Sequence, residues 1–256
     1  MFTDTHTHLY DEQLTADDQN IPRAIEAGVT RMYLPNCDSG TVAGMLEIAD
    51  RWPENCFPMM GLHPTYVKEN YKAELAIVAD HLKNRKYWAV GEIGLDYYWD
   101  VTYKEQQKEA FAMQIDLALA YNLPIVIHSR ESTADCIEMV RSKQNGKLCG
   151  IFHCFGGSKE EAEQITALGF YLGIGGVVTY KKSTLPEVLA GVPLKHIVLE
   201  TDAPYLAPVP YRGKRNESAY IPVVAHKLSE IYRLPIDEIA RITSENATKI
   251  FHANGQ

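Results

Sequence analysis

The sequence predicts a (β/α)8 barrel, also called a TIM barrel, an α/β fold in which eight parallel strands alternate with helices. Eight short apolar segments alternate with helical patterns along the 256 residues. No low-complexity linker divides the chain, so we expect one domain over residues 1–256. The alternative is an open doubly wound sheet, which the lack of a Gly-x-Gly-x-x-Gly turn after a strand disfavours.

The predicted strands are short and rich in β-branched, aromatic or aliphatic residues, as buried parallel strands are. They are Phe2–Leu9, Thr30–Pro35, Phe57–Gly61, Trp88–Glu92, Pro124–His128, Gly150–His153, Phe170–Ile174 and His196–Glu200. The second and seventh follow a helix that ends in glycine, at Ala27-Gly28 and Leu168-Gly169. This is the usual turn from a helix into a strand.

Helical patterns fill the intervals between the strands. The longest runs from Tyr103 to Tyr121, with an apolar face of Phe111, Ile115, Ala118 and Leu119. Capping boxes are predicted at Thr102–Glu105 and Ser158–Glu161. Two further helices are expected after the eighth strand, at Tyr220–Tyr232 and Ile236–Phe251.

The first strand carries two histidines, His6 and His8, separated by one residue. Successive side chains of a strand alternate between its faces, so both imidazoles point to the same side. Two neighbouring imidazoles pack poorly in an apolar core but bind metal ions well. The pair therefore predicts a metal site, although His-x-His also occurs in ordinary edge strands.

Catalytic groups of a barrel lie at the C-terminal ends of its strands, and this rule sorts the nine histidines. Five lie at or just past a strand end: His6, His8, His63, His128 and His153. His196 begins its strand and belongs to the opposite, structural face. The remaining three fall in helical segments and are expected at the surface: His81, His226 and His252.

Two carboxylates join the strand-end histidines. Glu92 ends the fourth strand, and Asp202 follows the eighth. An acid directly after an apolar run needs a cation or hydrogen bonds to be stable there. Histidines and acids therefore gather at one end of the predicted barrel.

Six motifs at these strand ends resemble those of the TatD family of metal-dependent deoxyribonucleases, which are (β/α)8 barrels of the amidohydrolase lineage. They are Asp4-Thr5-His6-Thr7-His8-Leu9, Gly61-Leu62-His63-Pro64, Gly91-Glu92-Ile93-Gly94-Leu95-Asp96-Tyr97-Tyr98, Ile127-His128-Ser129-Arg130-Glu131, His153-Cys154-Phe155 and Leu199-Glu200-Thr201-Asp202-Ala203-Pro204-Tyr205. The resemblance extends from Asp4 to about Phe251.

The resemblance implies a binuclear centre of two divalent metal ions. His6, His8 and Asp202 would hold one ion, His128 and His153 the other, and Glu92 would bridge them. Imidazole and carboxylate ligands suit Zn, Mn or Fe better than an all-oxygen Mg site, while abundant Mg is also expected to support turnover.

The chain departs from the family pattern at two places. The loop Arg212–Ser218 lacks the proline that usually follows Arg-Gly-x-x-Asn-x, and Gly156 stands where a hydroxyl residue is common. Neither departure removes an expected ligand. Both leave the shape of the loops open, and with it the choice of substrate.

These residues predict a two-metal phosphodiesterase, with Glu92 and Asp202 as catalytic residues and Asp202 also placed to take a proton from the attacking water. The formal charge of 25 − 33 = −8 and the lack of a long basic stripe predict a small footprint on nucleic acid. We therefore expect an exonuclease that acts on single-stranded DNA ends, and cleavage of RNA stays open. The resemblance implies 3′ ends.

Four residues are expected to contact or support the substrate: His63, Arg130, Glu200 and Arg215. Arg130 offers a planar fork for a phosphate, and Arg215 ends the dense basic stretch Tyr211–Arg215. Glu200 is expected either behind a ligand histidine or in a structural hydrogen bond. The aromatic run Tyr97–Trp99 is expected to pack in its loop or to stack on a terminal base.

Other functions stay open at this point. Relatives in the amidohydrolase lineage cleave C–N bonds, often with a modified lysine where this chain has Glu92, and an aminoacyl-RNA ester hydrolase would look similar. A metal-dependent binding protein without catalysis is a further alternative. Chelator-sensitive release of mononucleotides from an oligonucleotide would separate these classes.

Composition predicts a globular protein, because 46% of the residues are hydrophobic and 23% are charged. The five cysteines form no Cys-x-x-Cys pair, so reduced thiols are expected. The N-terminus lacks a basic leader pattern, and the longest weakly apolar stretch, Gly169–Val178, is too short to span a bilayer. We therefore expect a cytoplasmic protein with no membrane partner and no obligate protein partner.

Overall fold

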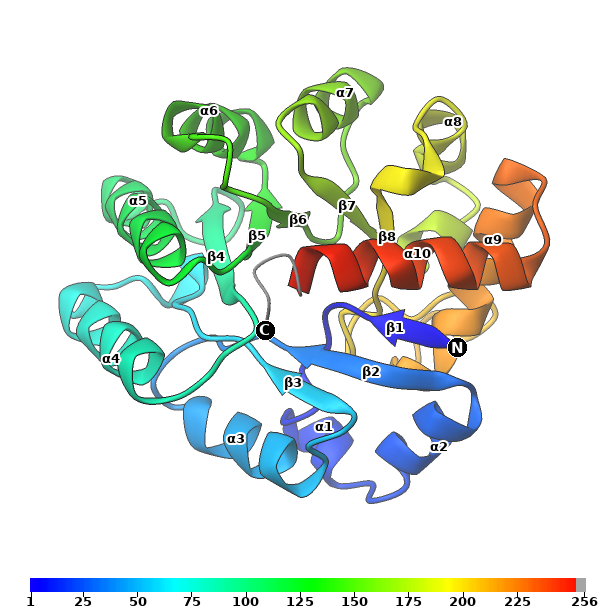
Figure 1. Ribbon diagram of the computed structural model, residues 1–256, viewed down its shortest axis with the longest axis horizontal. Helices are drawn as coiled ribbons and strands as arrows, with labels where there is room; N and C mark the ends of the chain where they lie inside the picture. Colours follow the sequence, from blue (N-terminus) through cyan, green and yellow to red (C-terminus); the bar gives the residue numbers. More distant parts are fainter. Residues whose placement is uncertain (252–256) are drawn as a thin grey trace.

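The computed structural model describes residues 1–251, which form a barrel of eight parallel strands inside a ring of helices (Figure 1). The strands are β1 (Phe2–Asp4), β2 (Val29–Leu34), β3 (Cys56–Pro58), β4 (Val90–Asp96), β5 (Ile125–Arg130), β6 (Gly150–Phe152), β7 (Tyr171–Ile174) and β8 (Ile197–Leu199). All eight predicted strands are confirmed in order. Their ends differ most at β1, which stops at Asp4 instead of Leu9.

Hydrogen bonds divide the strands into two sheets, β1–β2–β3 and β4–β5–β6–β7–β8. Two seams join the sheets into a barrel. Between β3 and β4, Met60 forms a parallel bridge to Val90. Between β8 and β1, the Thr5 N–H donates to the Leu199 carbonyl at 3.0 Å. The seams matter for function, because the predicted ligands Glu92, His6 and Asp202 lie beside them.

Ten α-helices are described within residues 1–251, and most surround the strands. They are α1 (Glu12–Thr15), α2 (Asn20–Glu26), α3 (Val42–Arg51), α4 (Tyr71–Asn84), α5 (Lys104–Tyr121), α6 (Thr133–Lys143), α7 (Lys159–Ala167), α8 (Leu185–Leu189), α9 (Ile221–Tyr232) and α10 (Ile236–Phe251). Four short 3-10 helices complete the connections: η1 (Pro64–Tyr66), η2 (Gly176–Thr179), η3 (Leu194–His196) and η4 (Ser218–Tyr220).

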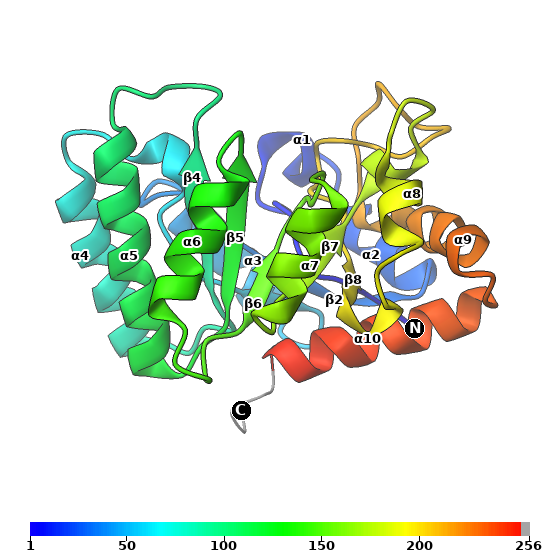
Figure 2. The ribbon, with the colours of Figure 1, turned by 90° about the horizontal axis from the view of Figure 1, so that it is seen from above.

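Apolar side chains fill the inside of the barrel, and α10 closes one end of it. Tyr33, Val126 and Val198 come from different strands and belong to one buried cluster with Phe251 of α10. The rings of Tyr33 and Phe251 stack with centroids 3.6 Å apart. Figure 2 shows α10 along the lower edge, so the loops that follow the strands are left at the opposite end.

The local sequence signals have mixed outcomes. Ser158 forms the predicted capping box with Glu161 at the start of α7. Gly28 and Gly169 both adopt φ of +83°, which explains the glycine at each turn. The capping box predicted at Thr102 is wrong, because its N–H is bonded to the Asp100 carboxylate at 2.9 Å and α5 begins only at Lys104.

Three of the histidines outside the strand ends lie in the expected elements, although His81 is only partly exposed. His196 ends η3, directly before β8, and His81 and His226 lie in α4 and α9. His252 falls outside the described residues. None of the helices within residues 1–251 has the length and apolarity needed to cross a membrane.

Candidate metal centre

The C-terminal ends of the strands open onto a cavity of about 990 Å³. Seven of the predicted site residues contribute to its wall: His8, His63, Glu92, His128, Arg130, His153 and Asp202. His6 is fully buried beneath them. The loops therefore enclose one cavity at the end of the barrel that α10 leaves open.

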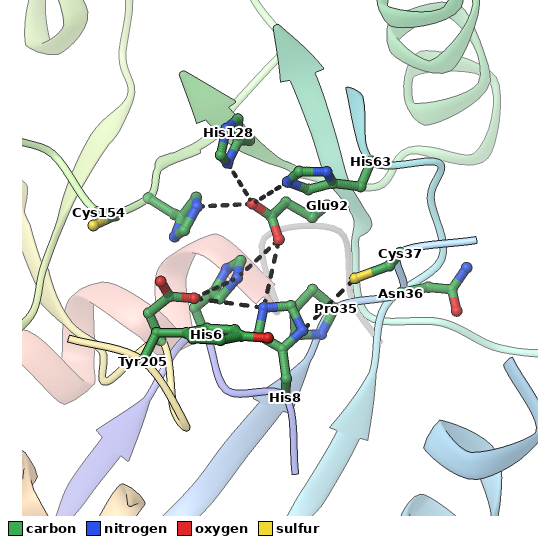
Figure 3. Close-up of polar contacts among 12 residues, drawn as sticks. His6, His8, Pro35, Asn36, Cys37, His63, Glu92, His128, Cys154 and Tyr205 are labelled. Carbon is green, nitrogen blue, oxygen red and sulfur yellow. Dashed lines mark hydrogen bonds and ion pairs between the residues drawn. The ribbon is translucent and has the colours of Figure 1, made fainter. Parts of the chain in front are cut away.

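Glu92 lies at the centre of this cluster, and its two carboxylate oxygens face different histidines (Figure 3). Oε2 is 3.1 Å from His6 Nε2 and 3.7 Å from His8 Nε2. Oε1 is 2.8 Å from His153 Nε2, 2.9 Å from His128 Nδ1 and 3.3 Å from His63 Nε2. Burial favours the neutral acid, but His153, His63 and His6 hold the pKa of Glu92 well below its usual range.

His6 provides the clearest test of whether these residues fit a metal ion. Neither of its ring nitrogens makes a hydrogen bond within the described residues. Burial lowers the pKa of His6, so its ring stays neutral, and its Nε2 faces Glu92 and Asp202, the latter at 3.7 Å. An unpartnered buried nitrogen that faces two carboxylates is costly alone and suits a cation, so the donor set fits a metal centre.

Tyr10 orients His8, although the sequence analysis did not identify it. The Tyr10 hydroxyl donates to the Pro35 carbonyl at 2.6 Å, so it accepts from His8 Nδ1 at 2.9 Å. His8 Nε2 then faces Asp202 at 3.5 Å. Burial opposes charge on His8, but Cys37 and Asp202 raise its pKa well above the usual range. A proton and a metal ion therefore compete for Nε2.

Two carboxylates lie next to His128 and His153, the other histidines predicted as ligands. Asp96 Oδ2 lies 2.8 Å from His128 Nε2, which leaves Nδ1 to face Glu92. Glu200 Oε1 lies 3.4 Å from His153 Nδ1, which leaves Nε2 to face Glu92. Such partners fix the orientation of a ligand histidine and raise its basicity. The sequence analysis named Asp96 only as part of a motif and gave it no role. Its spacing from Glu92 on β4, which places both side chains on one strand face, is a signal that could have identified it.

The structure corrects the expectation that Glu200 contacts the substrate. Its side chain is fully buried, does not line the cavity, and accepts a hydrogen bond from the Cys154 N–H at 2.5 Å. The two roles considered for it, support of a ligand histidine and a structural hydrogen bond, are both present. Glu200 can therefore affect the cavity only through a neighbour such as His153, because its own carboxylate does not line the cavity.

We predict that Asp96→Asn weakens metal binding by about 10- to 100-fold, because an amide cannot supply the negative charge behind His128. Isothermal titration with Mn²⁺ or Zn²⁺ measures this affinity. Asp100→Asn is the matched control, since Asp100 lies four residues after Asp96, beyond the end of β4, and pairs with Lys68 at 2.8 Å. Equal metal affinity in Asp96→Asn and the wild type would contradict the role given to Asp96.

Asp202 adopts a left-handed backbone conformation with φ of +57°, just past β8. This conformation is uncommon for residues other than glycine and turns the carboxylate toward His6 and His8. Burial alone would raise the pKa of Asp202, but His8, His153 and His6 lower it below the ordinary value. Asp202 is therefore ionised and able both to hold a cation and to accept a proton.

His63 differs from the other histidines in what it presents to the cavity. Its Nδ1 accepts from the Thr65 N–H at 3.2 Å. Burial lowers its pKa, so the neutral ring carries its proton on Nε2, 3.3 Å from Glu92 Oε1. The geometry could admit His63 to a metal site with Glu92 and His128. The bond to Thr65 instead makes its Nε2 a donor, suited to an anionic oxygen.

Arg130 and its aromatic neighbours lie at the cavity mouth. The guanidinium carbon is 3.8 Å from the Tyr98 ring centroid and 5.2 Å from that of Trp99. Arg130 and Trp99 line the cavity, and Trp99 is 67% exposed. Tyr97 instead packs in its loop, where its hydroxyl donates to Asp135 at 2.7 Å. Of the aromatic run, Tyr98 and Trp99 stay accessible to a base.

Arg215 is not brought to the cavity, which corrects its prediction as a substrate contact. Its Nη2 lies 2.8 Å from Asp17 and 3.4 Å from Glu217. Arg23 pairs with the same two carboxylates at 2.7 and 2.5 Å. These acids hold Arg215 in an ion-pair cluster between the α1–α2 segment and the loop after β8. Sequence alone could not show this, because Asp17 is far away in the chain.

The sequence of this chain is similar to those of one known protein family. The family model described as "TatD related DNase" matches residues 3–252. The metal-dependent hydrolase YabD of Bacillus subtilis is 38% identical over 256 residues, which cover 99% of this chain and 100% of YabD. The metal-dependent hydrolase YjjV of Escherichia coli is 33% identical over 255 residues, 98% of each chain.

Solved structures give the same result. The crystal structure of YjjV, described as a TatD homologue, has a TM-score of 0.92 at 31% identity and covers 98% of both chains. A TatD family hydrolase of Entamoeba histolytica has a TM-score of 0.85 at 23% identity, covering 98% of this chain and 97% of that one. The second similarity shows the shared fold.

Proposed function

Because this chain belongs to the family of TatD-related DNases, and is a metal-dependent hydrolase, we propose that it cleaves phosphodiester bonds of nucleic acid as a 3′–5′ exodeoxyribonuclease that prefers single strands. The observation that carries the proposal is that one cavity contains both residues able to hold cations and N–H donors able to bind anionic oxygens. Glu92 and its histidines can hold cations, and His63 and Arg130 offer N–H donors. A phosphodiester needs both cations and donors for its anionic oxygens.

The proposed ligand sets follow the two oxygens of Glu92. His6, His8 and Asp202 would hold one divalent ion, and His128 and His153 the second, with Glu92 shared. This mix of imidazole and carboxylate favours Zn or Mn, with Mg as a substitute when abundant. When bound, such ions supply Lewis acidity and positive charge to the phosphoryl group.

The chain's own residues would then position the substrate and accept a proton from the attacking water. Asp202 is ionised and accepts the proton of the attacking water. The Nε2–H of His63 donates to a non-bridging oxygen, and the Arg130 fork holds another. Trp99, exposed beside Arg130, stacks on a terminal base, which favours single strands because their bases are unpaired.

The five cysteines are unpaired, which supports a cytoplasmic location.

Linear and circular single-stranded DNA of the same sequence test this function. With Mn²⁺, Zn²⁺ or Mg²⁺, we expect chelator-sensitive release of mononucleotides from the 3′ end of the linear form, and an intact circle. Chromatography of strands labelled at either end gives polarity. Equal cleavage of the circle would indicate an endonuclease. Hydrolysis of an aminoacyl-RNA ester or cyclic amide, without cleavage of either DNA, would favour the alternatives.

Arg130→Ala should raise KM for a short oligonucleotide by about 10- to 100-fold, the size of a lost charge-assisted hydrogen bond. Arg130→Lys should restore only part of the loss, since an ammonium cannot replace a planar fork. Metal content should stay the same, because arginine does not ligate cations. Arg141→Ala, which removes an exposed ion pair on α6, is the control. Loss of metal from Arg130→Ala would refute the assignment.

A further inference from the structure

Two loops at the cavity end of the barrel carry four exposed cations, Lys181, Lys182, Arg212 and Lys214, named here the basic ridge. The first two lie between η2 and α8, and the others lie between β8 and η4. Figure 2 shows both loops rising at the end of the barrel opposite α10, on the side of α8. The basic ridge therefore shares its face of the molecule with the metal centre.

Specific contacts hold the two loops together. The Arg212 guanidinium lies 4.3 Å from the centroid of the Tyr180 ring. The Tyr180 hydroxyl donates to the Ala207 carbonyl at 3.0 Å, and the Val209 N–H donates to Thr179 Oγ1 at 2.8 Å. Cations that are about thirty residues apart in the chain therefore belong to one surface.

The basic ridge has no anionic partner among the described residues. The ion pairs of residues 1–251 include none of its four cations, and the acid of the same loop, Glu217, already pairs with Arg23 and Arg215. The chain as a whole is acidic, with a formal charge of −8. Unpaired like charges gathered on one surface repel one another, and a bound polyanion would remove that repulsion.

The surface between the cavity and the basic ridge is partly apolar. Tyr205 and Leu206 line the cavity, and with Val209 they are 51%, 39% and 44% exposed. These residues lead along the chain to Arg212. Exposed aromatic and apolar faces beside cations are typical of surfaces that bind single-stranded nucleic acid, because bases stack while phosphates pair with the cations.

We propose that the basic ridge binds the phosphate backbone of a single-stranded polynucleotide, several nucleotides away from the bond that is cut. The inference rests on the proposed function and adds to it a second binding region outside the metal centre. The enzyme should therefore distinguish substrates by length. A long strand reaches both the cavity and the basic ridge, whereas a very short one occupies the cavity alone.

The test compares two triple variants that remove the same charge. K181A/K182A/K214A removes three ridge cations but keeps Arg212, which stacks on Tyr180. K147A/K195A/K249A removes three exposed cations before β6, before β8 and in α10, away from the cavity. Binding of the metal-loaded protein to a hydrolysis-resistant phosphorothioate oligodeoxythymidine is measured by fluorescence anisotropy at several salt concentrations.

For a strand of about 20 nucleotides, the ridge variant should bind more weakly, and the slope of log affinity against log salt should fall by about 2, since each lost single-strand phosphate contact removes about 0.7. For about 3 nucleotides, the difference between the two variants should be much smaller. Identical slopes for both variants would overturn the proposal. So would a preference of the ridge for anionic lipid vesicles over the oligonucleotide.

Failure of the basic ridge and failure of the proposed function give different results. If both variants cleave strands with the same dependence on strand length, the proposed nuclease activity stands and the proposed role of the basic ridge is refuted. If long strands bind through the basic ridge but no phosphodiester is cleaved, the role of the ridge stands and the proposed reaction is refuted.

Discussion

Glu92→Gln should reduce turnover by several orders of magnitude and cost the protein at least one metal ion. Glu92 has oxygens within 3.7 Å of five histidine nitrogens, and it is the carboxylate that both groups of histidines share. Glutamine keeps the shape but removes the charge. Two cations held close together would then repel each other with less compensation, and loss of a major electrostatic element has effects of this size.

Metal content by elemental analysis and steady-state kinetics on a short oligonucleotide measure both effects. Glu109→Gln is a suitable control, because Glu109 is an exposed carboxylate on α5 that bonds to the Tyr71 hydroxyl at 2.7 Å. A Glu92→Gln protein that keeps two ions and near-normal turnover would show that Glu92 is not the shared ligand.

Asp202→Asn should lower kcat by about 10²- to 10⁴-fold, the range for loss of a general base. Asparagine tolerates the left-handed backbone that Asp202 adopts, so the loop should keep its shape. The expected result differs from that of Glu92→Gln in metal content. The ion near His128 and His153 should remain, because both stay paired with Glu92.

The acidic limb of the pH profile gives an independent readout for Asp202. If this carboxylate takes the proton, the variant should lose the limb of kcat that reports its ionisation. Asp50→Asn, an exposed residue paired with Arg85, controls for charge alone. Unchanged kcat in Asp202→Asn would leave Asp202 with a purely structural role.

The fold could be predicted because each strand carries its own apolar signal, and eight such signals in one chain leave few arrangements. The predicted common direction of His6 and His8 is confirmed even though β1 ends at Asp4. Thr7 still forms a parallel bridge to Ala203, so the backbone beyond Asp4 stays extended and both imidazoles point to one side. The pattern therefore predicted side-chain direction better than it predicted the length of the strand.

Asp4, a residue that the sequence analysis missed, acts through a pairing that no local pattern encodes. Asp4 is fully buried, accepts hydrogen bonds from Thr201 at 3.0 and 2.6 Å, and has its pKa raised by burial to about 7. It secures the seam between β1 and β8. Its partner lies 197 residues away, and Asp17 lies 198 residues from Arg215, with which it pairs. Such partners become visible only when the barrel closes.

That seam has a consequence for how the protein is made. The first residues of the chain, which include His6 and His8, find their second neighbour only in β8, and Asp202 follows directly after it. During synthesis, β1 therefore leaves the ribosome long before β8 has been made, although domains commonly begin to fold from the N-terminus. Nascent chains that end before Thr201 would hold unsealed sheets and an incomplete set of predicted ligands, so metal loading is expected to wait until β8 and Asp202 have been synthesised.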